Sequence, residues 1–341
     1  MIKISIIVPV YNVALYIKRC INSIMAQNCS GRSVECIIVD DCTPDDSMDI
    51  IHDMVDSYKG DIEFVFCSHD HNRGQSAARN TGIAKSTGDY VLFVDSDDHL
   101  SEDCLDLMIQ GLSAHPEVDV ILGNLYYCKY NRPFFPSVPY PTLLFDKSQI
   151  LLKIFFAELH CHAPSRLIRR SLLLDHHLFF VEGLLYEDMP WTYDLIMAMS
   201  SMLVLPNITY IYENNESSTM NSTKQNINKE IFSFCYIINY FLDKIFNDVR
   251  SNCRIYCFGI LLRIIDSSLK YNCSSDMKIM LSQTKRRLVK EAFLSGRLLM
   301  ALFFMTSLEP LVMIYKFRFV RSCYHKVTVI FGKIEGFLDK F

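Results

Sequence analysis

The chain has 341 residues, 50% of them apolar and 12% aromatic, which is enough for two or three packed domains and excludes a disordered or low-complexity protein. Lysine and arginine number 34 against 38 aspartates and glutamates, and this net charge of −4 argues against a domain that wraps nucleic acid. The charge is uneven, because residues 285–341 carry 11 basic and four acidic side chains, a balance of +7 that leaves −11 for residues 1–284. Any basic surface therefore belongs to the C-terminal tail.

The cysteines and the apolar segments bear on the compartment. Thirteen cysteines, an odd number without a Cys-x-x-Cys pair, argue against a disulfide framework, so we expect a reducing, cytoplasmic setting. The N-terminus has no secretory pattern, so we expect no export. The most membrane-like segment, Leu298–Tyr315, is interrupted by Glu309 and Pro310, and its uncharged part is shorter than the roughly 20 residues that a spanning helix needs. We therefore expect no transmembrane helix.

The first 125 residues alternate strand-like apolar runs with helical patterns. Ile17, Ile21 and Ile24 recur at helical spacing. Thr43-Pro44 predicts the start of a second helix, and Ser101–Asp103 that of another. Strands that alternate with helices pair in parallel through right-handed crossovers, so we predict an α/β fold with a mostly parallel sheet flanked by helices. The predicted strands are Ile2–Val8, Val34–Val39, Ile62–Phe66, Tyr90–Val94 and Val118–Leu122.

The pattern changes after residue 125. Tyr126–Pro141 is rich in aromatic residues and proline, which indicates a long connection, and Lys147–Leu159 has helical periodicity. The region His160–Tyr212 is mixed, and helical patterns dominate from about Asn226 to the end. The polar stretch Asn214–Asn228 predicts a boundary between a first domain, 1–223, and a helical C-terminal region, 224–341.

Three carboxylates follow the fourth predicted strand, in the segment Asp95-Ser96-Asp97-Asp98. Because ligands bind at the carboxyl ends of strands in open α/β sheets, these acids stand at a ligand-binding edge. Clustered carboxylates repel one another unless a cation neutralises them, and hard oxygen ligands suit Mg²⁺ or Mn²⁺ carrying a substrate's phosphates. The alternative is a solvated acidic turn that caps the next helix.

Two other strand ends bring polar groups to the same edge. Pro9, Tyr11 and Asn12 end the first strand, and Asp40 and Asp41 end the second. Tyr11 offers a ring face for stacking, and Asp41 can accept an N–H from a base. Capping of the following helix is the alternative role for the two acids.

Asn72-Arg73-Gly74 follows the third strand and predicts a tight turn that leads into a helix carrying Arg79. An arginine at this place can pair with a diphosphate or with Asp95 itself. A ligand contact and a structural salt bridge are both consistent with the sequence.

These motifs together resemble successive signatures of family 2 glycosyltransferases. The resemblance covers residues 1–125 closely and extends more loosely to about residue 223. It implies a GT-A fold with a nucleotide-binding half, 1–125, and an acceptor half, 126–223. It further implies a nucleotide-sugar donor, most often a UDP-sugar, a divalent cation held by an Asp-x-Asp motif, and inversion at the anomeric carbon. The motifs are Ser5–Asn12, Ile38–Asp45, Asn72–Gly74 with Ala78–Asn80, and Asp95–Asp98.

The resemblance assigns roles to single residues. Asp97 matches the direct metal ligand of the Asp-x-Asp motif. Asp95 matches the first acid of that motif, which usually contacts the ribose or sugar of the donor, and we expect both acids at the metal. Asp41 matches the acid that contacts uracil. The donor-binding residues implied in this way are Pro9, Tyr11, Asn12, Asp40, Asp41, Asn72, Arg79, Asp95 and Ser96.

A later segment, Phe180–Asp188, is similar to the family's Glu-Asp motif, whose aspartate is the usual catalytic base. Inverting transfer is one in-line displacement, which needs a carboxylate to deprotonate the acceptor hydroxyl and a cation to stabilise the departing diphosphate. We therefore expect Asp188 to be the base, with Glu187 beside it. The alternative is that Glu187 and Asp188 merely begin a helix.

The sequence departs from the family at two places. Cys42 stands where the family commonly has glycine or a small polar residue, and we expect it to be tolerated because its side chain is small. Glu213-Asn214-Asn215 stands where relatives often carry arginine, so a basic clamp on the diphosphate is not expected there.

Several residues of the acceptor half have alternative roles. His160-Cys161-His162 makes a poor zinc site, and we expect a structural or acceptor-pocket role. Arg166 and Arg169 can approach phosphates or a lipid-linked acceptor, but solvated charges are the favoured interpretation. We expect Trp191, the single tryptophan, to lie in the core rather than to form an acceptor platform.

The C-terminal tail mixes basic, aromatic and apolar residues over 285–341. This composition is typical of a helix that lies on an anionic membrane surface, and equally of a helical subdomain packed on the sheet.

The sequence favours an inverting, metal-dependent glycosyltransferase that moves a sugar from a nucleotide to a glycan or lipid-linked acceptor in polysaccharide synthesis, in the cytoplasm and peripheral at the inner membrane face. One alternative is an inactive nucleotide-binding partner subunit. A nucleotidyltransferase is less consistent, because the first strand is not followed by a glycine-rich loop.

Overall fold

The computed structural model describes residues 1–135, 141–155, 158–215, 227–246 and 274–294. The chain divides into two compact units, Met1–Leu262 and Arg263–Phe341. The first unit contains the sheet, and the described part of the second is helix α11 (Ser275–Leu294). The boundary predicted at residue 223 lies in the undescribed segment 216–226 and stays a prediction.

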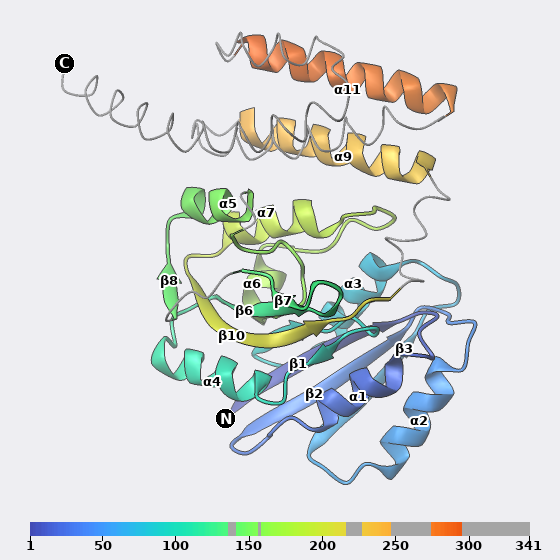
Figure 1. Ribbon diagram of the computed structural model, residues 1–341, viewed down its shortest axis with the longest axis vertical. Helices are drawn as coiled ribbons and strands as arrows, with labels where there is room; N and C mark the ends of the chain where they lie inside the picture. Colours follow the sequence, from blue (N-terminus) through green and yellow to red (C-terminus); the bar gives the residue numbers. More distant parts are fainter. Residues whose placement is uncertain (136–140, 156–157, 216–226, 247–273, 295–341) are drawn as a thin grey trace, which may run out of the picture. The chain divides into compact units, whose positions relative to one another are not determined.

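The first unit is built on one sheet with strand order β3-β2-β1-β4-β9-β6-β10-β5 (Figure 1). Outside this order, β7 pairs with β6 and β8 pairs with β10. All five predicted strands are present, with ends shifted by a few residues. They are β1 (Ile2–Val10), β2 (Arg32–Asp40), β3 (Ile62–Ser68), β4 (Tyr90–Phe93) and β6 (Val120–Tyr127). The others are β5 (His99–Leu100), β7 (Arg132–Pro133), β8 (Thr142–Leu144), β9 (Arg166–Arg169) and β10 (Met202–Tyr212).

The sheet is mostly parallel, as predicted, while the short strands β5, β7, β8 and β9 pair antiparallel with their neighbours. Strands β1, β2, β3 and β4 pair in parallel, and so do β6 and β10. Between them lies β9, antiparallel to both β4 and β6, so β6 has the same direction as β4. The carboxyl ends of the six main strands therefore meet at one edge.

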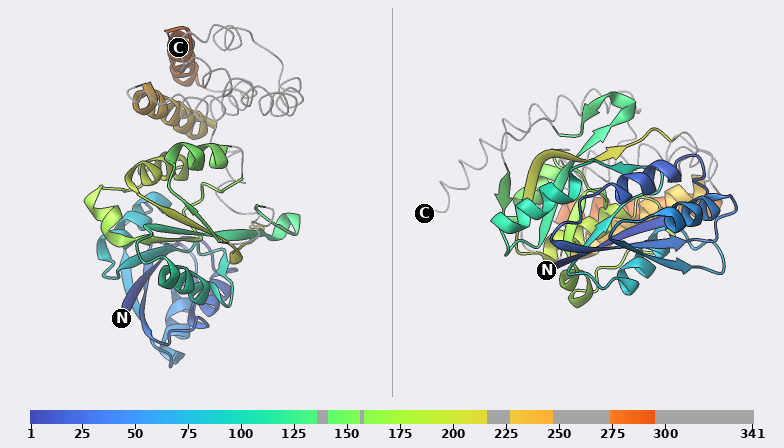
Figure 2. Two further views of the ribbon diagram at one scale, coloured as in Figure 1. Left: turned by 90° about the vertical axis from the view of Figure 1, so that its left-hand side faces the viewer. Right: turned by 90° about the horizontal axis from the view of Figure 1, so that it is seen from below.

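Helices cover both faces of the sheet (Figures 1 and 2). On one face lie α1 (Ile17–Met25), α2 (Ser47–Ser57) and α4 (Cys104–Ala114), which share a buried core with alternate β1 residues. On the other lie α3 (Gln75–Lys85), α6 (Arg170–Asp175) and α7 (Asp188–Ala198). A glycine allows α3 to approach closely, because a Cβ at Gly82 would lie 2.2 Å from a methyl carbon of Ile7.

The start of α2 was predicted too early. The helix begins at Ser47 rather than at Thr43, because Asp45 holds the preceding turn with its carboxylate, which accepts hydrogen bonds from the Thr43 and Ser47 hydroxyls. The start of α4 agrees with the prediction, since Asp103 is its N-cap residue. The region 128–155 contains a 3₁₀ turn (Cys128–Tyr130) and helix α5 (Lys147–Phe155).

Helix α9 (Ile227–Phe246) packs on α7 and on the segment before it. The Ser233 hydroxyl accepts the backbone N–H of Leu185 at 2.9 Å, and the Tyr186 hydroxyl donates to Glu230 at 3.1 Å. No helix of the described residues is long and apolar enough to cross a bilayer. The predicted membrane-like segment, 298–315, lies outside the described residues.

Candidate active site

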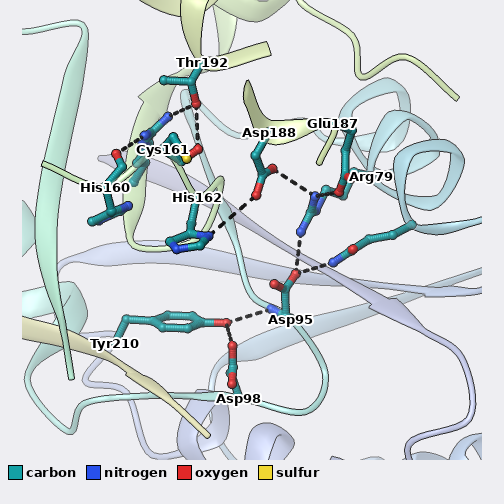
Figure 3. Close-up of polar contacts among 12 residues, drawn as sticks. Arg79, Asp95, Asp98, His160, Cys161, His162, Glu187, Asp188, Thr192 and Tyr210 are labelled. Carbon is teal, nitrogen blue, oxygen red and sulfur yellow. Dashed lines mark hydrogen bonds and ion pairs between the residues drawn. The ribbon is translucent and has the colours of Figure 1, made fainter. Parts of the chain in front are cut away.

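A tyrosine of strand β10 holds the acidic turn that follows β4 in place. The Tyr210 hydroxyl, on β10, accepts the backbone N–H of Asp95 at 3.1 Å and donates to Asp98 at 2.8 Å (Figure 3). Asp98 also accepts the backbone N–H of Glu213 at 2.8 Å. Asp98 is therefore a buried structural acid. The contact of Tyr210 with this turn could not be predicted from local patterns, because β10 lies more than 100 residues further along the chain.

Asp97 and Asp98 carry more negative charge than their surroundings favour. Burial, and then the charge of Asp95, raises the pKa of Asp97. Burial, followed by the charges of Asp97 and Asp95, raises the pKa of Asp98 further. Asn215 partly offsets this at Asp97, since its amide donates to Oδ2 at 2.9 Å. The ionised forms of both acids are therefore disfavoured, and a nearby cation would favour them.

These carboxylates suit a hard divalent cation. Within the described residues no group of three or more histidine, cysteine or acidic side chains is arranged to hold a metal. Mg²⁺ and Mn²⁺ are commonly bound through one or two carboxylates together with substrate phosphates, so the set still fits such an ion. Asp97 is the best placed ligand, because Arg79 and Gln75 both donate to Oδ1 of Asp95, at 2.7 and 2.8 Å.

Arg79 joins the acidic turn to the Glu-Asp motif. From helix α3 its guanidinium donates to Asp95 Oδ1 at 2.7 Å, to Glu187 Oε1 at 2.9 Å and to Asp188 Oδ1 at 3.3 Å (Figure 3). The side chain is 1% exposed and also lies over the Phe180 ring at 5.1 Å. Of the two roles that the sequence allowed, the structure shows the pairing with Asp95.

The electrostatics of Arg79 follow from these contacts. Burial alone lowers the pKa of a guanidinium, but the charges of Asp95, Asp188 and Glu187 outweigh it and raise the pKa of Arg79. The guanidinium therefore stays charged and neutralises part of the acidic cluster.

Glu187 and Asp188 begin a helix and also face the centre of the site. Helix α7 starts at Asp188, which confirms that these two acids begin a helix. This position is also compatible with a catalytic role for Asp188. Burial and the charge of Asp188 raise the pKa of Glu187 to about 7, although Arg79 acts in the opposite sense. The Asp188 carboxylate is more open, with 18% of the side chain exposed, and its Oδ2 lies 3.9 Å from Nδ1 of His162.

Asp41 holds the turn between β3 and α3. Its carboxylate, which is buried, accepts the backbone N–H groups of Arg73 at 2.8 Å and Gly74 at 2.7 Å. Nδ1 of His69 lies 2.7 Å from Oδ1, and Nε2 of that ring lies 2.9 Å from the Thr81 hydroxyl. The second acid of the pair therefore shapes the predicted nucleotide site, a role that the sequence did not reveal.

Asp40 and Tyr11 are the more accessible members of the predicted donor set. Tyr11 is 44% exposed, and Asp40 is half-buried and accepts the backbone N–H of Thr43 at 2.8 Å. The backbone N–H of Asn12 donates to the Thr43 hydroxyl at 2.8 Å, which ties the ends of β1 and β2 together. Pro9 and Ser96 are buried, and Asn72 is exposed.

The backbone conformation at Cys42, rather than the size of its side chain, explains why glycine is common at this position in the family that the sequence resembles. Cys42 has φ +57°, in the left-handed region that glycine adopts without steric conflict. A cysteine is accommodated here at the cost of backbone strain.

Arg166 is a correction to the sequence analysis. We expected solvated charges, but Arg166 is fully buried. Its guanidinium donates to the Thr192 hydroxyl at 2.8 Å and to the His160 carbonyl at 2.7 Å. Arg169 pairs with Asp119 at 3.3 Å. Trp191 lies in the core as expected, 2% exposed.

The fold and these carboxylates define a GT-A-like α/β domain with an acidic centre at its sheet edge. Comparison with known families agrees, since the family model described as "Glycosyl transferase family 2" matches residues 5–176. The chain belongs to this family.

Two relatives among the known proteins show how similar the chain is to other members of this family. It is 32% identical over 225 residues, 63% of its length, to the uncharacterized glycosyltransferase EpsJ of Bacillus subtilis, and it spans 62% of that protein. It is 28% identical over 218 residues, 62% of its length, to the poly(ribitol-phosphate) beta-N-acetylglucosaminyltransferase TarS of Staphylococcus aureus, of which it spans 35%. The chain therefore spans less than two thirds of either relative.

Solved structures confirm the GT-A fold. A crystal structure of Staphylococcus aureus TarS 1-349 in complex with UDP-GlcNAc superimposes with a TM-score of 0.62 at 20% identity, covering 88% of this chain and 89% of that one. The Pyrobaculum calidifontis mannosyltransferase PcManGT, solved with GDP-Man and Mn²⁺, gives 0.52 at 15% identity, with 89% and 84% covered.

Glu187 should make the stability of the protein depend on pH. Its folded-state pKa of about 7 lies above the ordinary glutamate value, so folding takes up a proton between these two pH values and stability falls as pH rises through this window. Glu187→Gln should reduce the fall between pH 5 and pH 7 by about 1–2 kcal/mol, measured by urea unfolding. Glu182→Gln, at an exposed position, is the control. Equal profiles for Glu187→Gln and wild type would contradict the assignment.

Proposed function

We propose that the protein is an inverting, metal-dependent glycosyltransferase that takes a sugar from a UDP-sugar. The observation that supports this most directly is the Arg79 bridge, because one buried guanidinium holds Asp95 of the predicted Asp-x-Asp motif against Glu187 and Asp188. This contact holds the proposed donor motif next to the candidate base in the protein without a ligand.

The donor would bind along the ends of β1, β2 and β4. Tyr11 has an exposed ring face for stacking on the base, and the Asp40 carboxylate is the acid positioned to accept its N–H. Asp41, committed to the Arg73–Gly74 turn, would shape this pocket rather than read the base itself. Asn72, exposed at the rim of this turn, completes the proposed donor set.

Asp97, with Asp95 beside it, would hold Mn²⁺ or Mg²⁺. When bound, the ion would stabilise the negative charge of the departing diphosphate. Arg79 keeps Asp95 oriented through its 2.7 Å contact, and Asn215 does the same for Asp97. Asp97 is only partly buried, whereas Asp98 is buried and bonded to Tyr210, which supports Asp97 as the ligand.

Asp188 would act as the general base. Its carboxylate would take the proton of the acceptor hydroxyl as that oxygen bonds to the anomeric carbon and the bond to the diphosphate breaks. Asp188 is more exposed than Glu187, which Arg79 holds at 2.9 Å. Glu187 would complete the site as the partner that keeps Arg79 in place.

We propose a glycan or lipid-linked acceptor in polysaccharide synthesis, handled by the predicted acceptor half, 126–223, with the helical region 224–341 as a separate part. The poly(ribitol-phosphate) polymer in the name of TarS supports a polymer acceptor. The alternative, an inactive nucleotide-binding subunit, is less consistent with the retention of all three acids, Asp95, Asp97 and Asp188.

Removal of the proposed metal ligand should weaken donor binding. Asp97→Ala should lower the affinity for UDP in the presence of Mn²⁺ roughly 10- to 100-fold, because the ion loses its main protein ligand. Isothermal titration calorimetry with and without Mn²⁺ measures this effect. Asp70→Ala, at an exposed site, serves as control. Retention of Mn²⁺-dependent UDP binding by Asp97→Ala would remove Asp97 as the ligand.

Loss of the proposed base should separate chemistry from donor binding. Asp188→Asn should reduce transfer by about 10²–10⁴-fold while the Kd for UDP with Mn²⁺ changes little. Transfer is measured as UDP release from a panel of UDP-sugars with para-nitrophenyl glycosides as acceptors. Asp175→Asn, on the exposed end of α6, controls for loss of a carboxylate. A fully active Asp188→Asn protein would rule out the base assignment.

We further propose that the basic tail binds the anionic face of a membrane. At about 1 kcal/mol for each basic residue near the surface, replacing Lys316, Arg318 and Arg321 together by glutamine should weaken binding to phosphatidylserine vesicles by roughly 100-fold. Vesicle co-sedimentation of the full chain measures this loss. Replacement of the exposed Lys59, Lys85 and Lys129 is the matched control, and equal loss in both variants would contradict a specific role for the tail.

A further inference from the structure

A histidine that the Glu-Asp motif does not include faces the proposed base. The Nδ1 atom of His162 lies 3.9 Å from Asp188 Oδ2 (Figure 3). On the other side of the ring, Nε2 lies 3.1 Å from the Tyr127 hydroxyl. About a third of the His162 side chain is exposed, so the ring is reachable from solvent. Its neighbour His160, in contrast, is buried, with Nε2 3.2 Å from the Gly123 carbonyl oxygen.

The two neighbours of His162 select one tautomer. Burial lowers the pKa of His162 more than the Asp188 charge raises it, so the ring is neutral at pH 7 and carries one N–H. Burial also raises the pKa of Tyr127, so the phenol keeps its proton and can donate to Nε2. The carboxylate of Asp188 attracts the remaining N–H to Nδ1, and the ring is therefore protonated on the nitrogen that faces the base.

The loop that carries His162 is fixed to the helix that carries Asp188. The Thr192 hydroxyl, one turn along α7, donates to the Cys161 carbonyl at 2.7 Å and accepts from the Arg166 guanidinium at 2.8 Å. Arg166 in turn donates to the His160 carbonyl at 2.7 Å. Because Thr192, Arg166 and His160 are buried, the fold sets the spacing between His162 and Asp188.

The 3.9 Å separation is too long for a direct hydrogen bond and suits a bridging oxygen. An oxygen at about 2.8 Å from both atoms can donate its proton to Asp188 and accept the N–H of His162. We propose that His162 binds the acceptor hydroxyl in this position, with Tyr127 as the residue that sets its tautomer, an inference that rests on the proposed function. The acceptor oxygen keeps a lone pair for attack, and its proton goes to Asp188 in the transfer step.

Aromatic rings around His162 indicate what carries this hydroxyl. Tyr212 lies 5.9 Å and Phe134 6.4 Å from the His162 ring, centroid to centroid, and Tyr127 packs on both. Flat apolar faces beside a polar group are suited to a sugar ring, which has apolar C–H faces and hydroxyls at its edge. These aromatic rings therefore favour a sugar hydroxyl, rather than the phosphate of a lipid carrier, as the nucleophile.

The tautomer can be measured without any substrate. In protein labelled with ¹⁵N-histidine, the signals of His162 are identified by their loss in His162→Asn, and we expect the Nδ1–H form. Tyr127→Phe should shift His162 toward the Nε2–H form, whereas Tyr126→Phe, whose hydroxyl contacts Asn131 instead, should leave it unchanged. An Nε2–H tautomer in the wild-type protein would overturn the inference.

The hydroxyl contact is tested by kinetics with the best UDP-sugar and para-nitrophenyl glycoside of the transfer assay. His162→Phe keeps a ring but no N–H, so the acceptor kcat/KM should fall about tenfold or more while the KM for the donor stays unchanged. His162→Asn, which restores an N–H near the Nδ1 position, should recover part of this loss. Equal acceptor kcat/KM in wild type and His162→Phe would refute the contact.

Different results would contradict the proposed function and the inference about His162. If wild-type protein transfers no sugar to any glycoside of the panel, the proposed function is contradicted, and the tautomer measurement still decides the arrangement of His162. If wild type transfers and Asp188→Asn does not, while His162→Phe behaves as wild type, the proposed function stands and the His162 inference is wrong.

Discussion

The candidate site depends on one interaction, the buried guanidinium of Arg79 among three carboxylates. Asp95 comes from the turn after β4, Glu187 and Asp188 from the start of α7, and Arg79 from α3. Removing one partner of such a buried group typically destabilises a protein by about 3–5 kcal/mol, because uncompensated charge remains. The same contact that joins these elements therefore fixes the distance between the proposed donor motif and the proposed base.

The sheet makes this arrangement possible. Because β9 runs antiparallel between β4 and β6, the direction of β6 and β10 matches that of β4, and Tyr210 on β10 reaches the turn after β4. Asp98 completes this link through its 2.8 Å bond to the same hydroxyl. The acidic turn is thus held from β10 on one side and from Arg79 on the other, which leaves Asp97 as the acid with a raised pKa and partial exposure.

Local patterns predicted the first half of the fold well, and long-range contacts explain what they missed. The five main strands that begin in the first 125 residues showed as apolar runs, because most of them are buried on both faces, whereas the two-residue strand β5 was not predicted. The short β9 was missed because Arg166 looks like a surface residue in sequence. Its charge is satisfied by Thr192 and the His160 carbonyl, which only the folded chain brings together.

The same distinction holds inside the site. Asp95, Asp97 and Asp188 were predicted because each belongs to a recognisable motif. The different roles proposed for Asp40 and Asp41 depend instead on the turn at Gly74, a contact across more than 30 residues. His162 was noted only as part of His160-Cys161-His162, for which the sequence predicted a structural or acceptor-pocket role. Its position is set by a loop tied to α7 through Thr192, so the feature that makes it chemically relevant, a ring nitrogen 3.9 Å from Asp188, is a property of packing. Motifs therefore located the acids that the resemblance implies, whereas the contact proposed between His162 and an acceptor hydroxyl had to come from the structure.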